Sequence, residues 1–291
     1  MAAKSRKIDT RSIGLDLWAA TAKFVTGKEN LHYGLWTGLE PVAGNLGAAQ
    51  EAYTTKLLSF LGDAPLRILD IGGGAGETAK RLEALGHRVE IVVPSRFLAE
   101  RCRANVGSCT PVHETKFEDF ASESGFDACL FSESFQYIPM AVALEKAASL
   151  LLPDGFILIA DCFRLEAFRS NDEKRRIVGG GWLLSDFREA LSERSLEIRR
   201  EEDVSEDVAP SVELEQEFFN LIGYFIKRAD SGLAASHPFA RSLATFFFRL
   251  IVNRRRRARL AKRLYETSRT AEEFCRFNRY LMLKIAPSSR T

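Results

Sequence analysis

The chain has 291 residues, enough for one large α/β domain with additions or for two small domains. Its hydrophobic content of 46% is ordinary for a globular protein, and a formal net charge of +2 gives no general argument for nucleic-acid binding. It has no apolar run of membrane-spanning length, no apolar signal core, and five cysteines without C-x-x-C spacing. These features predict a cytoplasmic protein without a metal site.

Residues 1–61 are expected to form a helical arm ahead of the core. The apolar spacing from Ile13 to Phe24 indicates a short amphipathic helix, and a second helix is expected at residues 46–61. The glycine-broken loop at residues 30–41 separates the two helices. It concentrates hydrogen-bonding and aromatic side chains, namely His32, Tyr33 and Trp36. The plainest interpretation is an aromatic staple that pins the arm to the core.

The core begins with the sequence LRILDIGGGAG at residues 66–76. Apolar residues surround Asp70, as in a buried parallel strand, and a helical pattern follows the glycines until Gly86. A glycine-rich turn between strand and helix lets a ligand approach the backbone and exposes the amides of the helix N-terminus. A turn without a ligand is the alternative, but so dense a glycine run costs unfolded-state entropy without a reason.

Two further strands are expected at residues 88–93 and 110–114, with a helix between them at residues 97–105. A fourth strand is expected at residues 126–131. The loop after it, residues 132–138, contains Glu133 and Tyr137. Because ligands in open α/β sheets bind outside the carboxyl ends of the strands, this loop is expected to face the site.

The rest of the sheet and a long helical insertion follow. A helix at residues 141–151, a turn at residues 153–155 and a fifth strand at residues 156–161 come first. Ser185 is expected to cap the next helix, and a sixth strand begins near Leu196. The last strand is expected at residues 279–287. About residues 206–273 then form an insertion with two apolar stripes, longer than a hairpin loop.

The spacing of Gly72, Gly74 and Gly76 after Asp70 resembles the first motif of class I S-adenosylmethionine (SAM) dependent methyltransferases. In dinucleotide-binding Rossmann proteins, the nearest competitor, the third glycine comes later. The strings HYGLW and SESFQYI, and the turn before the fifth strand, resemble the sterol, tocopherol and ubiquinone methyltransferases and the cyclopropane synthases. The match runs over residues 66–163. In those families the HYGLW segment folds over the active site.

The resemblance implies a Rossmann-like doubly wound α/β fold. Its seven-stranded sheet has the last strand antiparallel, between the fifth and sixth, and a helical cap. The expected division is an arm and lid (1–61), a methyltransferase-like core (62–205), a helical insertion as cap (206–273) and the last strand (274–291). The implied cofactor is SAM, with S-adenosylhomocysteine (SAH) as product.

Carried over residue by residue, the family pattern gives a set of expected cofactor-binding residues: Tyr33, Asp70, Gly72, Gly74, Gly76, Val93, Phe117 and Ser132. Asp70 and the glycines correspond to the residues that hold the methionine half of SAM. Val93 stands where the family has an acid for the ribose hydroxyls, and Lys116 where it commonly has an acid for the adenine amine. By strand alternation, Glu90 does not reach the mouth of the sheet.

Methyl transfer requires alignment of donor and acceptor and, for some acceptors, a base. The candidate catalytic residues are Glu133, Tyr137 and His32. The predicted function is SAM-dependent C- or O-methylation of a small, largely apolar metabolite. The alternative is a fold relative that has lost methyl transfer and catalyses a cyclisation or rearrangement, or serves as a binding partner. The missing acid at Val93 favours this alternative, and the intact glycine motif favours the first.

The arm and the insertion are expected to meet above the first and fourth strands and enclose an apolar chamber with Glu133 at its floor. The aromatic residues expected to wall the chamber are Phe218, Phe219, Phe225, Phe246 and Phe247. The arginine run (Arg254, Arg255, Arg256 and Arg257) is expected outside it. A solvated helix face is its ordinary role. Beside apolar residues it is also suited to peripheral contact with an anionic membrane or to a homodimer. No nucleic-acid partner is expected.

Overall fold

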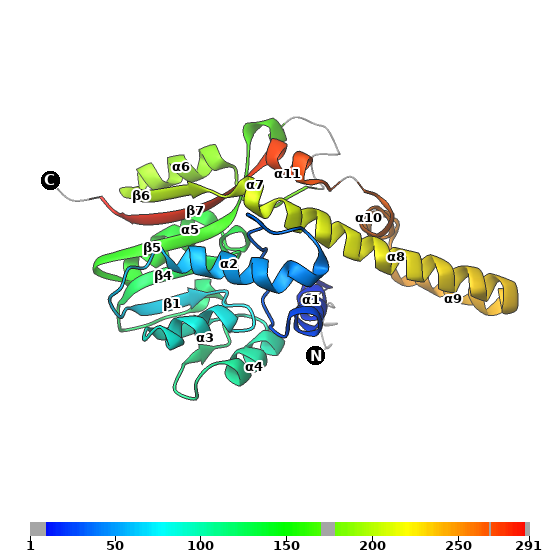
Figure 1. The fold of residues 1–291 in the computed structure, drawn as a ribbon, viewed down its shortest axis with the longest axis horizontal. Coiled ribbons are helices and arrows are strands. Elements are labelled where there is room, and N and C mark those ends of the chain that lie inside the picture. The colour runs from blue at the N-terminus through cyan, green and yellow to red at the C-terminus, as the bar shows by residue number, and fades with distance from the viewer. Residues whose placement is uncertain (1–9, 170–177, 268, 289–291) are drawn as a thin grey trace, which may run out of the picture.

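The computed structural model describes residues 10–169, 178–267 and 269–288. Seven strands form one sheet in the order β3-β2-β1-β4-β5-β7-β6 (Figure 1). β7 is antiparallel to both of its neighbours, whereas the pairs from β3 to β5 are parallel. This confirms the predicted Rossmann-like sheet with its last strand antiparallel between the fifth and sixth. The strands are β1 (Arg67–Ile71), β2 (Arg88–Val92), β3 (Val112–His113), β4 (Phe126–Ser132), β5 (Leu151–Arg164), β6 (Leu196–Asp203) and β7 (Asn278–Pro287).

Helices cover both faces of the sheet and extend beyond it (Figure 1). They are α1 (Thr10–Thr26), α2 (Leu46–Leu58), α3 (Glu77–Ala84), α4 (Arg96–Asn105), α5 (Met140–Leu150), α6 (Leu184–Glu193), α7 (Ser205–Val208), α8 (Pro210–Ser236), α9 (Pro238–Ile251), α10 (Arg254–Tyr265) and α11 (Ala271–Phe277). Among the described residues, no helix is long and apolar enough to cross a membrane.

Strand alternation divides the core into two layers. Ile68 of β1 packs with residues of α2, α3 and α4 on one face, and its neighbour Leu69 packs with residues of α5 and α6 on the other. Successive side chains of a strand point to opposite faces, so a continuous apolar run such as that of β1 is buried on both sides. The carboxyl ends of β1 and β4 lie side by side at the edge of the sheet where the glycine turn begins.

Two local expectations were wrong. Ser185 does not cap α6: the N-cap is Leu183, without a side-chain cap bond, and the Ser185 hydroxyl instead contacts Glu166. β5 begins at Leu151, before the predicted position, because Leu151 pairs with Phe126 ahead of a register shift. Asp154 has a φ of 67° within this irregular stretch, in agreement with the turn expected there.

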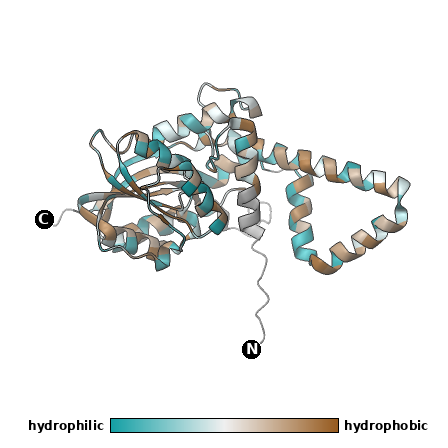
Figure 2. Cartoon of the chain, turned by 90° about the horizontal axis from the view of Figure 1, so that it is seen from below, coloured by the Kyte–Doolittle hydropathy of each residue, from teal (hydrophilic) through white to brown (hydrophobic). Residues whose placement is uncertain are grey.

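The insertion forms helices, but only its first part lies over the sheet. α8 starts against the arm, where the Trp36 indole N–H donates to the Ser211 hydroxyl at 2.7 Å. It then runs out from the body of the protein, and α8, α9 and α10 form a triangular projection (Figures 1 and 2). Phe225, Phe246 and Phe247 lie on this projection and are exposed. Their expected place in the chamber wall was therefore wrong.

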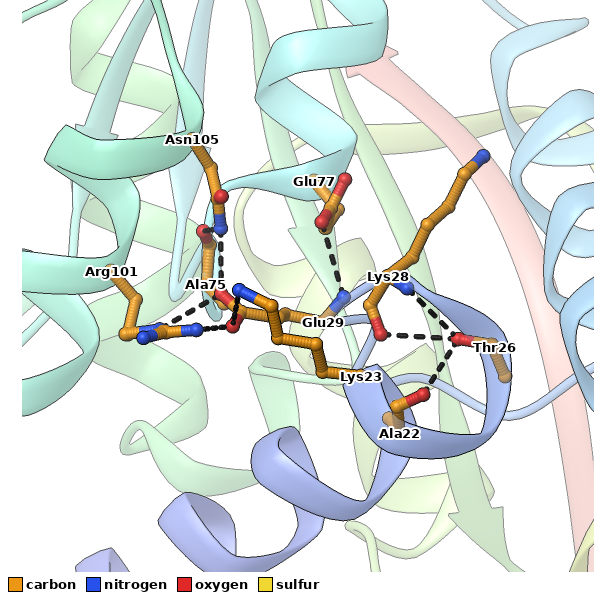
Figure 3. Close-up of polar contacts among 9 residues, drawn as sticks. All are labelled: Ala22, Lys23, Thr26, Lys28, Glu29, Ala75, Glu77, Arg101 and Asn105. Atoms are coloured by element: carbon orange, nitrogen blue, oxygen red, sulfur yellow. Dashed lines mark hydrogen bonds and ion pairs between the residues drawn. The ribbon is translucent and has the colours of Figure 1, made fainter.

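A buried carboxylate fastens the arm to the core. Glu29 is 2% exposed and forms ion pairs with Lys23 of α1 and Arg101 of α4 (Figure 3). The Asn105 amide donates to Glu29 Oε2 at 2.8 Å, and the Glu29 backbone N–H donates to Glu77 at 3.1 Å. Glu29 therefore joins α1 to both helices that flank the glycine turn.

We expect Glu29→Ala to lower the free energy of unfolding by about 1–3 kcal/mol, because it leaves partly buried cations without their carboxylate. Chemical denaturation of the variant and of the parent measures this change. Glu51→Ala is the control, since Glu51 pairs with Lys28 on the surface and exposed pairs contribute little. Equal losses in the two variants would contradict a special role for Glu29.

Candidate active site

A cavity of about 1110 Å³ opens at the carboxyl ends of the parallel strands. Its walls come from α1 and the loop after it, from the turns after β1, β2 and β4, and from α8. This is the position at which open α/β sheets bind ligands. The volume exceeds that of a pocket for one small ligand, so the cavity has room for a cofactor and an acceptor together.

The glycine turn forms one wall of the cavity. Gly72 and Gly74 have φ values of 75° and 55°, which favour glycine, and both line the cavity with Gly73. A Cβ at Gly72 would lie 2.4 Å from the Ser134 Cβ, and one at Gly74 would lie 3.2 Å from Leu31 of the arm. The turn therefore lets both the loop after β4 and the arm approach its backbone.

Gly76 does not line the cavity, contrary to its expected role in cofactor binding. Its φ is 89°, and a Cβ there would lie 3.1 Å from the Cα of Cys102 in α4. Gly76 stands at the N-cap of α3 and allows α3 and α4 to pack closely. Of the three spaced glycines, two belong to the cavity and the third to helix packing.

Asp70 supplies an acidic group at the base of the turn. The side chain is 1% exposed and lines the cavity, and burial raises its pKa to about 7. Its Oδ2 atom is buried and has no hydrogen-bond partner. A buried acceptor without a donor is costly, so this atom fits a ligand that brings one. The ammonium group of the methionine half of SAM is such a donor.

Val93 and the segment after β3 form the next part of the wall. Val93 is 1% exposed and lines the cavity where the family has its ribose-binding acid. Glu90 is not among the cavity residues, because it pairs with Arg67 and His113, as strand alternation predicted. Lys116, Phe117 and Glu118 line this end of the cavity.

Glu133 lies at the end of β4 in a strained backbone conformation. Its φ is 55°, which is uncommon for any residue but glycine, and its N–H donates to the Ala160 carbonyl at 2.8 Å. Its Oε1 accepts hydrogen bonds from the Tyr33 N–H at 2.7 Å and from the Tyr280 hydroxyl at 3.0 Å. Burial raises the pKa of Glu133 to about 8 despite these donors. The side chain therefore holds a proton through much of the neutral range.

A chain of hydroxyl groups extends from Glu133. The Tyr280 hydroxyl lies 2.8 Å from that of Tyr53, which lies 3.1 Å from the Ser132 Oγ. Tyr280 and Tyr53 are both fully buried, and burial raises their pKa values well above the ordinary value for tyrosine. Both hydroxyls therefore stay protonated, and Ser132, Glu133 and Tyr280 present this chain to the cavity.

His32 is built into the arm rather than offered to a substrate. Its Nδ1 lies 2.7 Å from the Tyr33 carbonyl oxygen, and its Nε2 lies 3.2 Å from the Thr54 hydroxyl. The ring stacks on Tyr53 with centroids 4.3 Å apart, and burial lowers its pKa to about 4. His32 also lines the cavity, but both of its ring nitrogens already have partners within the protein, so its catalytic role stays a prediction. Tyr137 lines the cavity and is half exposed.

Aromatic residues make the wall opposite the sheet. Trp18 of α1 meets Phe218 of α8 edge to face, with centroids 5.7 Å apart, and Phe219 lies beside them. Glu215, one turn earlier on α8, forms ion pairs with Arg263 and Arg269. The part of the insertion near the body therefore does meet the arm at the cavity, as predicted for Phe218 and Phe219.

Several site residues escaped the sequence analysis, and all of them depend on long-range pairing. Tyr280 reaches Glu133 because β7 pairs with β5 in a register that sets Tyr280 against Cys162. Asp161, within β5, holds the loop after β4 by accepting from the Gln136 N–H at 3.0 Å. The local sequence does not mark Tyr280 or Tyr53 as site residues, because a tyrosine in an apolar strand or helix most often lies in the core. Glu215 is likewise not distinguished by its neighbours in the sequence.

Residues 69–159 match the model of the methyltransferase domain family. This match, together with the sheet order and the glycine turn, confirms the predicted class. Residues 69–159 carry a methyltransferase domain, and the sheet has the class I SAM-dependent methyltransferase fold. Comparison with the curated proteins gives no match. No group of three or more His, Cys, Asp or Glu side chains suited to a metal ion occurs among the described residues.

Solved structures of this fold extend over nearly the whole chain. The geranyl diphosphate C-methyltransferase from Streptomyces coelicolor A3(2), in complex with SAH, is 14% identical with a TM-score of 0.65, and the match covers 98% of this chain and 100% of that one. The cyclopropane synthase MmaA2 from Mycobacterium tuberculosis is 14% identical, with a TM-score of 0.63 over 94% and 93% of the chains. The [4+2]-cyclase SpnF is 16% identical, with a TM-score of 0.62 over 96% of each.

We expect Val93→Asp to strengthen SAM binding by about 1 kcal/mol or more, because the new carboxylate would accept from the ribose hydroxyls. Isothermal titration calorimetry measures the change. Val93→Asn, which has the same size without the charge, is the control and should gain less. Unchanged or weaker binding in Val93→Asp would mean that Val93 does not face the ribose.

We expect the stability of the parent to fall, relative to Glu133→Gln, as the pH rises from about 5 to about 8. In the folded state the pKa of Glu133 lies above its unfolded value, so the unfolded state binds fewer protons in this window. The difference should reach about 1 kcal/mol or more. Asp70 titrates in both proteins and cancels. Denaturation at a series of pH values measures it, and a pH-independent difference would contradict a raised pKa.

Proposed function

We propose that the protein transfers a methyl group from SAM to a carbon or oxygen of a small, largely apolar acceptor. The observation that carries this proposal is one cavity with two kinds of lining. The glycine turn and the partnerless carboxylate oxygen of Asp70 suit a donor, and Glu133 with the aromatic residues suits an apolar acceptor. When bound, SAM supplies an electrophilic methyl group and leaves as SAH.

We assign the SAM-binding residues from those that line the cavity. Asp70 would bind the ammonium group, and Gly72 and Gly74 allow the donor to pass close to the backbone. Val93 and Phe117 would border the ribose and the adenine. Ser132 and Tyr33 lie next to Glu133. Because position 93 is a valine and not an acid, more of the affinity for SAM has to come from contacts with the methionine half of SAM.

Glu133 is the proposed base for the acceptor. Its carboxylate form can take a proton from an acceptor hydroxyl, or from the carbon next to a cation left by C-methylation. The Tyr280 hydroxyl, at 3.0 Å, holds Oε1 in place and leaves Oε2 for the acceptor. Tyr137, at the rim, is proposed to contact the acceptor as it enters. The aromatic residues Trp18, Phe218 and Phe219 would exclude water and bind an apolar body.

A second function is favoured by Val93, which stands where the family has an acid. A protein of this fold that has lost methyl transfer would keep the cavity for a cyclisation or rearrangement, or as a binding partner. The [4+2]-cyclase SpnF, with a TM-score of 0.62, is a cyclase with this fold. The intact glycine turn and Asp70 favour methyl transfer.

The remaining partner assignments are also proposals. We propose that the enzyme works in the cytoplasm without a nucleic-acid partner, because the basic residues gather on α10 and not around the cavity. Contact with a membrane surface or with a second subunit would then be peripheral and would involve the arginine run.

The test is a calorimetric titration of the protein with SAM and with SAH. The protein is then incubated with methyl-labelled SAM and an organic-solvent extract of cells of the organism that encodes it. We expect both ligands to bind and label to enter the apolar fraction. Binding without transfer to any fraction would favour the second function. If neither ligand binds, both the assignment of SAM as donor and the proposed methyl transfer are overturned.

We expect Glu133→Gln to retain SAM binding and to lower methyl transfer about 10²–10⁴-fold, because the amide keeps both hydrogen bonds but takes no proton. In the parent, the rate should rise with pH toward an apparent pKa near 8. Tyr280→Phe is the companion variant. It removes the hydrogen bond to Oε1 and the one to Tyr53 but leaves the carboxyl group, so it should shift the pH profile more than it lowers the maximal rate. Full activity in Glu133→Gln would exclude Glu133 as the base.

A further inference from the structure

The outer part of the triangular projection exposes an apolar helix. α9 has no buried residue, although five apolar side chains recur along it at helical spacing. These are Phe239, Leu243, Phe246, Phe247 and Leu250. Ile251, the last residue of α9, is 78% exposed. Exposed apolar surface of this extent marks an interaction site.

Positive charge follows directly on this apolar helix. Residues 238–265 contain nine lysines and arginines and no aspartate or glutamate. Arg241 pairs with Asp230 and Arg263 with Glu215, both on α8. Arg254, Arg255, Arg256 and Arg259 are exposed. The corner between α9 and α10 therefore joins apolar residues to a cluster of cations, and in Figure 2 it is the hydrophobic lower vertex of the triangle, separate from the body of the protein.

The projection is held in place by contacts between α8 and α10. The Gln216 amide of α8 donates to the carbonyl oxygens of Arg263 at 3.0 Å and Glu266 at 2.8 Å. At Gly223 the two helices approach so closely that a Cβ would lie 2.3 Å from the Leu264 carbonyl oxygen. Asn253 caps α10 by accepting from the Arg256 N–H at 2.9 Å. The corner is thus presented by a braced frame.

We propose that this corner, residues 246–257, docks on an anionic lipid surface. Phe246, Phe247, Leu250 and Ile251 would enter the boundary between headgroups and acyl chains, and the arginine run would contact the anionic headgroups. A symmetric contact with a second copy would set the five arginines of the corner against the same five. A nucleic acid would leave the phenylalanines exposed. The anionic lipid surface satisfies both the charge and the apolar side chains.

The inference goes beyond methyl transfer, because it concerns a surface outside the cavity. It also connects with an apolar acceptor. α8 carries Phe218 and Phe219 at the cavity and continues to the projection, so docking would hold the enzyme on the phase in which apolar molecules gather.

Sedimentation with vesicles of phosphatidylcholine, with and without phosphatidylserine, tests the proposal. We expect the full chain to bind only the vesicles with phosphatidylserine, and less at high salt. Arg255→Glu/Arg256→Glu should lower the binding about tenfold or more. Phe247→Ser/Ile251→Ser should also lower it, and it keeps every charge.

Two matched variants and one readout serve as controls. Arg96→Glu/Arg103→Glu makes the same charge change on α4. Leu85→Ser/Val142→Ser makes the same polarity change at exposed positions on the body of the protein. Both variants should bind vesicles as the parent does. Retained SAM affinity in every variant shows that the fold and the site are intact.

Four results would overturn the proposal. The first is no binding to anionic vesicles by a parent that binds SAM, and the second is equal binding to both kinds of vesicle. The third is an equal loss in the α4 variant. The fourth is a projection that holds a soluble dimer, or binds an oligonucleotide more tightly than vesicles. Failure of methyl transfer with intact vesicle binding would leave this inference standing.

Discussion

One carboxylate oxygen joins three parts of the chain that are distant in sequence. Oε1 of Glu133, after β4, accepts from the Tyr33 N–H of the arm and from the Tyr280 hydroxyl of β7. A buried carboxylate without donors would be costly, so the arm and the last strand must both be in place before Glu133 can be buried there. The left-handed backbone at Glu133 is maintained by the same packing.

The lining of the cavity has two origins. One part comes from a short stretch of sequence, in which β1 runs through the glycine turn into α3. The other is assembled from the loop after β4, the arm, α8 and β7. A local motif can preserve the first part while distant elements change the second. This division agrees with a fold that is shared by a C-methyltransferase, a cyclopropane synthase and a cyclase at 14–16% identity.

α8 has two roles along its length. Its first half carries Glu215, Phe218 and Phe219 to the cavity, where Trp18 and Arg269 meet them. Its second half, with α9 and α10, leaves the body and exposes its apolar residues. The change occurs near Gly223, where α10 crosses closely enough to exclude any side chain. α8 therefore connects the cavity to the exposed apolar surface of the projection.

The sequence by itself determined the strands and the glycine turn, because these depend on local periodicity and on a motif with fixed spacing. The antiparallel last strand between the fifth and sixth was implied by the family resemblance. It also indicated Glu133 and the aromatic loop near His32. Only the tertiary structure decided what each residue does. Tyr33 and Thr54 engage both nitrogens of His32, and Gly76 turned to α4. Tyr280 joined the site through strand register, and Phe246 and Phe247 stayed outside it. Helical periodicity shows which side chains share a face, but what packs against that face depends on contacts between residues far apart in the chain.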